Sequence, residues 1–194
     1  MDVVGEDSHL DPVTRARDGD LDAFEELVVL HAPAAYRVAM AVVGETLARD
    51  LVGEVFLAAW QQLPRLRDPD QFVPWLHRIL VNRGRSMLRR GRAVREIPVS
   101  AWYEGTLVHP HDGMGAAESR AVLASTFAAL SYDQCSVIAL HYAAGLSMRE
   151  VGEALDVPAG TARSRLAAAL EALRRRSGLD AADETRWARG GGAR

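Results

Sequence analysis

The sequence predicts an all-α fold built from two small helical domains that are joined by a flexible linker. Apolar residues recur at helical spacing along nearly the whole chain, and no stretch alternates for long enough to indicate a sheet. Residues 94–117 lose this periodicity and collect Pro and Gly, a composition typical of linkers. We therefore expect a first domain at residues 1–93, a second domain at 118–178 and a disordered tail at 179–194.

The first three helices of the first domain follow from apolar spacing and helix breakers. Asp20 precedes an amphipathic helix. Pro33 interrupts the apolar pattern, so we expect a separate second helix that follows the proline and ends at Gly44. A third helix is predicted at residues 46–63 and ends at Pro64. Its apolar stripe consists of Leu47, Leu51, Val55 and Leu57.

The fourth helix is long and basic. Asp68 is positioned as an N-cap, followed by a Pro at the first helical position and a Gln at the third. Pro74 would break a helix already under way, so either a short turn precedes the helix or it begins at about Phe72. Its apolar face lies opposite a face rich in Arg.

The second domain carries two capping boxes, Ser131 with Gln134 and Ser147 with Glu150, and each predicts the start of a helix. The expected elements are a helix at 118–130, a helix from 131 that ends at Gly145, a helix from 147, a turn at 156–158 and a last helix at 159–176.

The composition indicates an intracellular protein. The single cysteine, Cys135, cannot form an internal disulfide or build a cysteine-rich metal site, which favours a reducing cytosol. The N-terminus is acidic where a signal peptide would be positively charged, and no apolar run approaches the roughly 20 residues of a membrane helix. We therefore expect a cytoplasmic protein without a membrane span.

Charge is strongly segregated behind the net charge of −3. Residues 65–95 hold nine Arg and two Asp, which gives +7, and residues 163–176 hold five Arg and one Glu, which gives +4. Residues 96–162 hold eight acidic residues and two Arg, which gives −6. Local positive charge favours binding to a phosphate backbone. The alternative for each basic segment is a solvated helix face.

The stretch SMREVGEALDVPAGTARSRLAAAL, residues 147–170, has the pattern of a helix-turn-helix. In such units the start of the second helix enters the major groove, where Arg donates to guanine and Ser or Thr contacts bases or phosphates. The residues placed there are Thr161, Arg163, Ser164 and Arg165. The alternative is an ordinary helical hairpin.

The basic helix of the first domain places aromatic and amide side chains among arginines. Trp75, Arg78, Asn82, Arg83 and Arg85 combine a stacking surface, edge donors and positive charge, which suit unstacked single-stranded bases. Taken alone, a tryptophan at this position is more often a core residue.

Three stretches in this order resemble the extracytoplasmic-function (ECF) sigma factors, over about residues 15–176. They are DLVGEVFLAAWQQL, FVPWLHRILVNRGRSMLRR and, after the linker, LSYDQCSVIALHYAAGLSMREVGEALDVPAGTARSRL. The resemblance covers conserved regions two and four of that family and is more specific than a lone helix-turn-helix. It implies a factor that joins RNA polymerase and gives it promoter recognition.

The resemblance also implies three sets of contact residues. The helix at residues 48–62 would dock on the clamp helices of the largest polymerase subunit through Asp50, Leu51, Glu54, Val55 and Trp60. The loop and basic helix would recognise and open the minus-ten element through Arg65, Arg67, Trp75, Arg78, Asn82, Arg83, Arg85 and Arg89. The helix-turn-helix would read the duplex minus-thirty-five element through Thr161, Arg163, Ser164 and Arg165.

The chain departs from the family pattern at two places. Gly53 stands where relatives usually have Gln, which removes one polar contact from the docking helix. Ala167, Ala168 and Ala169 replace the aromatic or basic residues common in the recognition helix, which predicts a weaker or shorter contact with the upstream element.

The expected partners are core RNA polymerase and promoter DNA, and the family adds an anti-sigma protein that no residue here indicates. No catalytic set, cofactor or metal site is predicted. One alternative is a helix-turn-helix regulator that acts without polymerase, which explains only residues 118–176. Another is an enzyme that uses a metal on His109 and His111, with Cys135 as a third ligand, which is a poor zinc site because the ligands are scattered.

Overall fold

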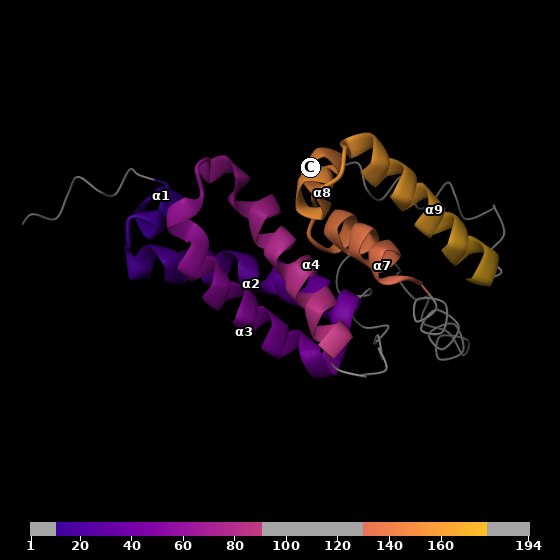
Figure 1. Ribbon diagram of the computed structural model, residues 1–194, viewed down its shortest axis with the longest axis horizontal. Helices are drawn as coiled ribbons and strands as arrows, with labels where there is room; N and C mark the ends of the chain where they lie inside the picture. Colours follow the sequence, from indigo (N-terminus) through magenta and orange to yellow (C-terminus); the bar gives the residue numbers. More distant parts are fainter. Residues whose placement is uncertain (1–10, 91–129, 178–194) are drawn as a thin grey trace, which may run out of the picture.

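The structure, a computed structural model, describes residues 11–90 and 130–177. Within these ranges every regular element is helical, which confirms the predicted all-α fold. Figure 1 shows two groups of helices, α1 to α4 in one and α7 to α9 in the other. The linker at 94–117, the expected helix at 118–130 and the tail at 179–194 lie outside the described residues.

The first group begins with a short helix that the sequence analysis did not predict, and the second group includes a π-helical segment. The helices of the first group are α1 (Pro12–Arg17), α2 (Leu21–Val43), α3 (Glu45–Gln62) and α4 (Phe72–Arg90), with 3₁₀ turns at Leu63–Arg65 and Pro69–Gln71. Those of the second group are α7 (Tyr132–Ile138), the π-helical segment (Ala139–Ala143), α8 (Met148–Leu155) and α9 (Ala159–Ser177).

Helix α2 differs from the prediction, because it is one continuous helix with Pro33 inside it. Asp20 caps its N-terminus as expected, and its carboxylate accepts a hydrogen bond from the N–H of Ala23 at 3.0 Å. A proline leaves the carbonyl four residues earlier, here that of Val29, without its helical donor. Val29 is 71% exposed. Water can therefore reach the carbonyl group that lacks a helical donor, so the helix can continue through the proline.

Helix α2 is also long and apolar enough, by length and composition alone, to cross a membrane. A run of this length was not expected, because Pro33 was predicted to divide the segment into two shorter helices. Core helices pass the same test, and α2 packs against α3 and α4 with ten buried residues, among them Phe24, Leu27 and Val38. This packing makes α2 the central helix of the first group.

Helix α3 follows after a sharp reversal at Gly44, whose φ of 85° suits glycine. Its limits match the prediction, and Leu51 and Val55 of the predicted apolar stripe are fully buried. Leu57, however, is 60% exposed, so the stripe was wrong at this residue. The reason is geometric: a residue two positions after Val55 lies about 200° around the helix, on the opposite face.

Helix α4 begins at Phe72 and is preceded by a short 3₁₀ turn. The preceding turn and the start at Phe72, which were predicted as alternatives because of Pro74, are therefore both present. The Asp68 carboxylate caps the turn by accepting from the N–H of Asp70 at 3.1 Å. Pro74 lies in the first turn of α4, where backbone N–H groups have no partner within the helix. The proline therefore costs this helix no hydrogen bond.

Both predicted capping boxes of the second group are confirmed. The hydroxyls of Ser131 and Ser147 accept from the backbone N–H of Gln134 and Glu150, whose side chains accept in return from the serine N–H groups. Helix α7 does not run directly to Gly145 as predicted, because the π-helical segment widens its last turns. The last helix, α9, has the predicted limits to within one residue.

The two groups pack against each other. Helix α4 contacts α8, and α2 contacts both α7 and the π-helical segment. Three hydrogen bonds cross this interface: the Tyr132 hydroxyl donates to the carbonyl of Val81 at 2.7 Å, Arg37 Nε donates to the carbonyl of Ala143 at 3.2 Å, and the Arg85 guanidinium donates to the Asp133 carboxylate. The buried apolar residues of the two groups consequently form one continuous cluster.

Candidate nucleic-acid interface

Helices α8 and α9 form the predicted helix-turn-helix. Helix α8 ends at Leu155, the following residue Asp156 adopts a left-handed conformation with φ 57°, and the N–H of Val157 donates to the carbonyl of Gly152 at 2.9 Å. Such a return bond is the usual way to satisfy the last carbonyls of a helix. The turn passes so close to α8 that a Cβ on Gly152 would lie 2.7 Å from the carbonyl oxygen of Val157. Glycine is therefore what allows this turn to pack on α8.

The first turns of α9 present the residues predicted to read duplex DNA. Arg163 and Ser164 are exposed, whereas Thr161 and Arg165 are half-buried. The Ser164 hydroxyl donates to the carbonyl of Thr161 at 3.0 Å, which leaves its oxygen as an acceptor. One turn further on, Ala167 is exposed and offers no polar group. The polar side chains predicted to read DNA thus all lie in the first two turns of α9.

Helix α4 carries most of the predicted minus-ten residues on one continuous stripe. Trp75, Arg78, Asn82, Arg85 and Arg89 follow one another at spacings of three and four, so they share one side of the helix. Trp75 and Arg85 are half-buried and the other three are exposed. The stripe combines one aromatic ring, one amide and three guanidinium groups along the length of α4.

The remaining predicted minus-ten residues lie apart from this stripe. Arg83 is on another side of α4, where it forms an ion pair with Glu54 of α3 at 3.3 Å. Arg65 and Arg67 are exposed on the segment between α3 and α4. The structure therefore joins five of the eight predicted residues into one surface and leaves the other three beside it.

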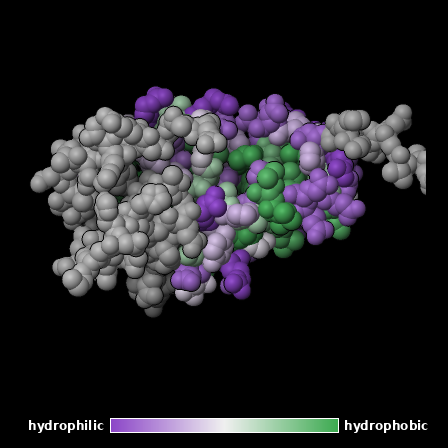
Figure 2. Space-filling model, turned by 180° about the vertical axis from the view of Figure 1, so that it is seen from behind, coloured by the Kyte–Doolittle hydropathy of each residue, from purple (hydrophilic) through white to green (hydrophobic). Residues whose placement is uncertain are grey.

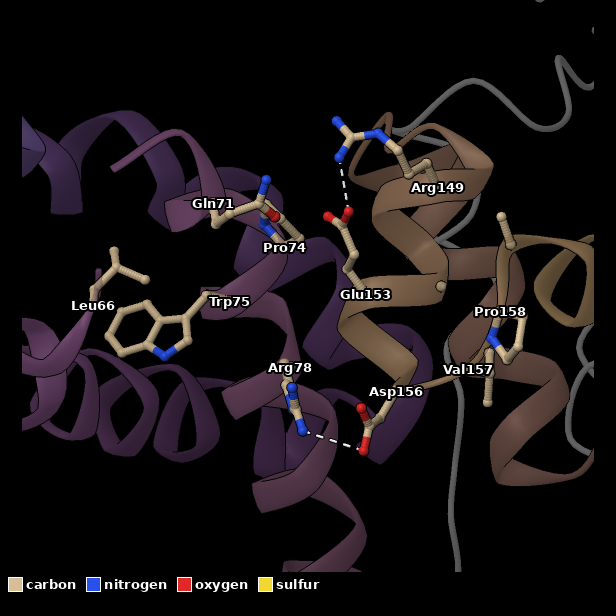
Figure 3. A pocket seen from close by; sticks show the side chains of 12 residues that line it. Leu66, Gln71, Pro74, Trp75, Arg78, Arg149, Glu153, Asp156, Val157 and Pro158 are labelled. Carbon is tan, nitrogen blue, oxygen red and sulfur yellow. Dashed lines mark hydrogen bonds and ion pairs between the residues drawn. The ribbon is translucent and has the colours of Figure 1, made fainter. Parts of the chain in front are cut away.

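The α4 stripe faces the second group of helices. A groove of about 620 Å³ separates α4 from α8, and Figure 3 shows Trp75 and Arg78 on one side of it and Glu153 and Asp156 on the other. Arg78 forms an ion pair with Asp156 at 3.2 Å, and Arg85 pairs with Asp133 at the start of α7. These acidic partners were not predicted, because they lie more than 40 residues away from their arginines along the chain.

The predicted polymerase-binding residues of α3 fall into two classes. Asp50 is exposed and Glu54 and Trp60 are half-buried, so each has some surface accessible to solvent. Leu51 and Val55 are fully buried in the protein's own core, and the prediction that they contact a partner does not fit this fold. Leu57, which the sequence pattern placed on the apolar stripe, is exposed and shares the outer face of α3 with Asp50 and Glu54 at spacings of three and four.

The described residues hold no group of three or more His, Cys, Asp or Glu side chains that is arranged to bind a metal ion. Cys135 is fully buried, and His109 and His111 lie outside the described residues. His77 is buried in α4, and its Nδ1 lies 2.9 Å from the carbonyl of Val73. Burial lowers the pKa of His77, with a smaller contribution from the nearby His31.

Comparison with known proteins identifies both halves of the chain. Residues 27–94 match the family model of sigma-70 region 2, and residues 127–175 match that of sigma-70 region 4. The ECF RNA polymerase sigma-E factor of Escherichia coli strain K12 is 31% identical over 171 residues, which span 83% of this chain and 90% of that protein. The RNA polymerase sigma-H factor of Pseudomonas aeruginosa is 28% identical over 172 residues, which span 83% and 89%.

Solved structures give the same relationship. The chain is similar to CnrH, solved in complex with the cytosolic domain of CnrY, with a TM-score of 0.63 and 27% identity over 84% of this chain and 93% of that one. It shares the fold of the Bartonella quintana sigma factor RpoE, solved with the anti-sigma factor NepR, with a TM-score of 0.57 and 24% identity over 82% and 99%. This chain therefore belongs to the ECF RNA polymerase sigma factors, which are transcription initiation factors that bind RNA polymerase and promoter DNA.

Proposed function

We propose that three surfaces of this sigma factor divide the work of promoter recognition: the outer face of α3 docks on core polymerase, the α4 stripe reads the minus-ten element and the start of α9 reads the minus-thirty-five element. The observation that carries this proposal is the α4 stripe, because one side of a single helix aligns stacking, amide and guanidinium groups. The proposed domains are residues 1–93 and 118–178.

The docking surface is proposed to combine carboxylates with exposed apolar side chains. The most exposed large apolar residues among the described segments all belong to α2 and α3: Leu21, Val29, Leu30 and Leu57. Leu30 and Leu57 are assigned to the docking surface, whereas Leu21 is not, because it lies nine residues before Leu30 at the start of α2. Figure 2 shows hydrophobic surface on the rear face of this half of the molecule. Leu30 and Leu57 lie 14 residues before and 13 residues after Gly44, at nearly the same height on two packed helices. Exposed apolar patches commonly mark protein–protein interfaces.

The α4 stripe is suited to single-stranded DNA. Stacking of a base on an aromatic ring contributes about 1–3 kcal/mol in other proteins and is offered here by Trp75. The Asn82 amide carries both a donor and an acceptor and is exposed, so it is the residue best placed to distinguish one base from another. The arginines of the stripe supply contacts to phosphate.

The start of α9 is suited to duplex DNA. Arg163 is the exposed guanidinium nearest the helix N-terminus, and a bidentate contact from Arg to guanine is the commonest specific contact in the major groove. Because Ala167 adds no polar group, the minus-thirty-five contact is proposed to be short. Opening the promoter requires binding and not bond cleavage, so the protein acts as a factor in the cytoplasm, where polymerase works, and not as an enzyme.

The test is binding to purified core RNA polymerase, followed by run-off transcription from a library of genomic promoters. The wild type should bind the core and produce promoter-selective transcripts. Leu57→Arg should weaken core binding at least tenfold, whereas Leu21→Arg, the same change at a similarly exposed leucine, should leave it unchanged. Tight duplex binding by the free chain, with no binding to polymerase, would instead support the regulator that acts without polymerase.

A further inference from the structure

Arg83 is a basic residue of α4 to which the three proposed surfaces give no role. The family resemblance placed it with the minus-ten residues, but it lies about 100° around the helix from Asn82 and about 160° from Arg85. Its side chain reaches α3, where it forms an ion pair with Glu54 at 3.3 Å. Arg83 therefore points away from the α4 stripe and toward the helix that is proposed to dock on polymerase.

The ion pair between Arg83 and Glu54 joins two accessible surfaces. The side chain of Arg83 is 37% exposed and that of Glu54 is 43% exposed, so solvent reaches both. The hydrogen bond between them uses one of the five N–H donors of the guanidinium group and one of the two carboxylate oxygens. Both side chains therefore keep hydrogen-bonding capacity for a partner.

The fold itself gains little from this ion pair. Water screens ion pairs between side chains as exposed as these, and many such pairs make no measurable contribution to stability. Helices α3 and α4 are held together instead by fully buried side chains of one apolar cluster, Leu51 and Val55 from α3 and Leu76 and Leu80 from α4. The positive charge of Arg83 is consequently free to serve binding.

Arg83 belongs to a second side of α4. Four residues follow one another there at spacings of four, four and three, so they lie along one line on the helix: Ile79, Arg83, Met87 and Arg90. The first three are half-buried and Arg90 is exposed. Met and Arg are both enriched at protein–protein interfaces. The second side of α4, made of these four residues, thus combines apolar surface with two guanidinium groups.

We propose that the docking surface for core RNA polymerase continues from the outer face of α3, across the ion pair, onto the second side of α4, where Arg83 and Arg90 bind acidic side chains of the polymerase. The proposal rests on the proposed function, which assigns the outer face of α3 to polymerase. It divides α4 by partner: the α4 stripe binds DNA, and the second side binds protein.

A guanidinium group can bind phosphate as well as carboxylate, and two observations favour protein carboxylates here. A DNA strand that stacks on Trp75 and reaches Asn82 follows the α4 stripe, and Arg83 points to another side of the helix. The apolar side chains of Ile79 and Met87 beside the arginines also suit a protein surface, whereas a phosphate backbone is contacted by polar and charged groups.

The interface variant is Arg83→Gln with Arg90→Gln in the full-length chain. Glutamine is a good helix former and removes the positive charge, so α4 should persist. Binding to purified core RNA polymerase, without DNA, is measured by fluorescence anisotropy of the chain labelled at its N-terminus. Circular dichroism and urea unfolding check that the variant is folded and as stable as the wild type.

The matched control is Arg149→Gln with Arg175→Gln in the second group of helices. It removes the same two positive charges at exposed side chains, each of which pairs with a glutamate on its own helix. Neither residue belongs to a surface that is proposed to bind polymerase or DNA. A loss of binding that merely follows net charge would therefore appear in both variants.

Arg90→Gln alone separates direct contact with polymerase from an effect through Glu54. Arg90 lies about two helical turns after Arg83, so its replacement leaves the ion pair in place. A weaker binding of this single variant must come from the second side of α4 itself. It also replaces the interface variant if the double substitution fails to fold.

A second measurement tests whether Arg83 contacts DNA. Run-off transcription from the promoter library is repeated with the interface variant at concentrations that saturate core polymerase, so that weaker docking no longer limits transcription. The relative use of the promoters should then match that of the wild type.

We expect core binding to weaken at least about tenfold in the interface variant and about threefold in Arg90→Gln, because charged contacts are lost, and to stay unchanged in the control. The proposal is overturned if either variant binds core as tightly as the wild type. It is also overturned if the saturated interface variant uses different promoters, which would return Arg83 to the minus-ten element. Leu57→Arg tests the proposed function separately: if it weakens core binding and the interface variant does not, only the extension onto α4 is refuted.

Discussion

Gly152 should be the residue of the helix-turn-helix that tolerates a methyl group least, and Gly152→Ala tests this directly. A Cβ at this position would lie 2.7 Å from the carbonyl oxygen of Val157, 3.2 Å from the nitrogen of Ala159 and 3.3 Å from its Cα. All three atoms belong to the backbone, so no side chain can rotate away. The whole turn must move, and with it the start of α9.

Two opposing effects set the size of the change. Replacing glycine by alanine inside a helix stabilises it by about 1 kcal/mol. Forcing an extra carbon into a well-packed site costs about 1–3 kcal/mol. The steric cost should dominate at Gly152, because one contact is well below the separation that real Cβ atoms adopt, and we expect the free energy of unfolding to fall by up to about 2 kcal/mol.

Gly160→Ala is the matched control for stability. It lies in the first turn of α9, and a Cβ there would have no atom within 4 Å. The same chemical change should leave stability unchanged or raise it by up to about 1 kcal/mol. Urea unfolding followed by circular dichroism measures both variants. Equal stability of the wild type and Gly152→Ala would refute the argument that the turn is packed too tightly for alanine.

Three further predictions concern other parts of the molecule. Asn82→Ala should change the preferred minus-ten sequence and Arg163→Ala should weaken use of the upstream element, measured by run-off transcription from a promoter library; an unchanged profile for both would remove these assignments. Because burial lowers the pKa of His77, the unfolded chain gains this proton first as the pH falls, so stability is complete above the ordinary pKa of about 6.5 and is lost below it. His77→Phe should lower the slope of the free energy of unfolding against pH by up to about 1.4 kcal/mol per pH unit, measured by urea unfolding between about pH 7.5 and 5.5. An unchanged slope would contradict the assignment of this pH dependence to His77. Pro33→Ala should stabilise the protein by about 1–2 kcal/mol, since it restores a helical N–H at an exposed position but also frees the unfolded chain; a lower melting temperature would show that the proline fits α2 without cost.

The features that sequence reasoning predicted correctly are local ones. Asp20, Ser131 and Ser147 cap helices because a short polar side chain satisfies N–H groups two or three residues away, and that chemistry is complete within one turn. The α4 stripe and the turn before α9 were likewise predictable, because each depends on residues within one short segment. In the same way, the family resemblance rested on segments that are each nearly continuous.

The errors arose where distant residues decide the outcome. Pro33 does not break α2, because the packing of the surrounding residues against α3 and α4 outweighs one missing hydrogen bond. Leu51 and Val55 were assigned to a docking surface from the family alone, although the buried side of α3 is fixed by α2 and α4. Leu57 was missed because it was placed on the apolar stripe. Asp133 and Asp156, the acidic partners of the α4 arginines, could not be predicted from the sequence, since a long segment separates them from α4.

The arginines of the α4 stripe form ion pairs within the protein and are also proposed to bind phosphate, so the salt dependence of DNA binding should differ from that of a surface without such ion pairs. Salt screens the exposed ion pairs of Arg78 and Arg85 and also weakens phosphate contacts through counterion release. In the wild type the two effects oppose each other, because salt weakens the ion pairs of these arginines with Asp156 and Asp133 while it also weakens their contacts with phosphate. A variant with Asp133→Asn and Asp156→Asn lacks these ion pairs and retains only the second effect. Its affinity for single-stranded DNA should therefore fall more steeply with salt than that of the wild type, and the difference in slope measures the ionic part of the contact between α4 and the second group of helices.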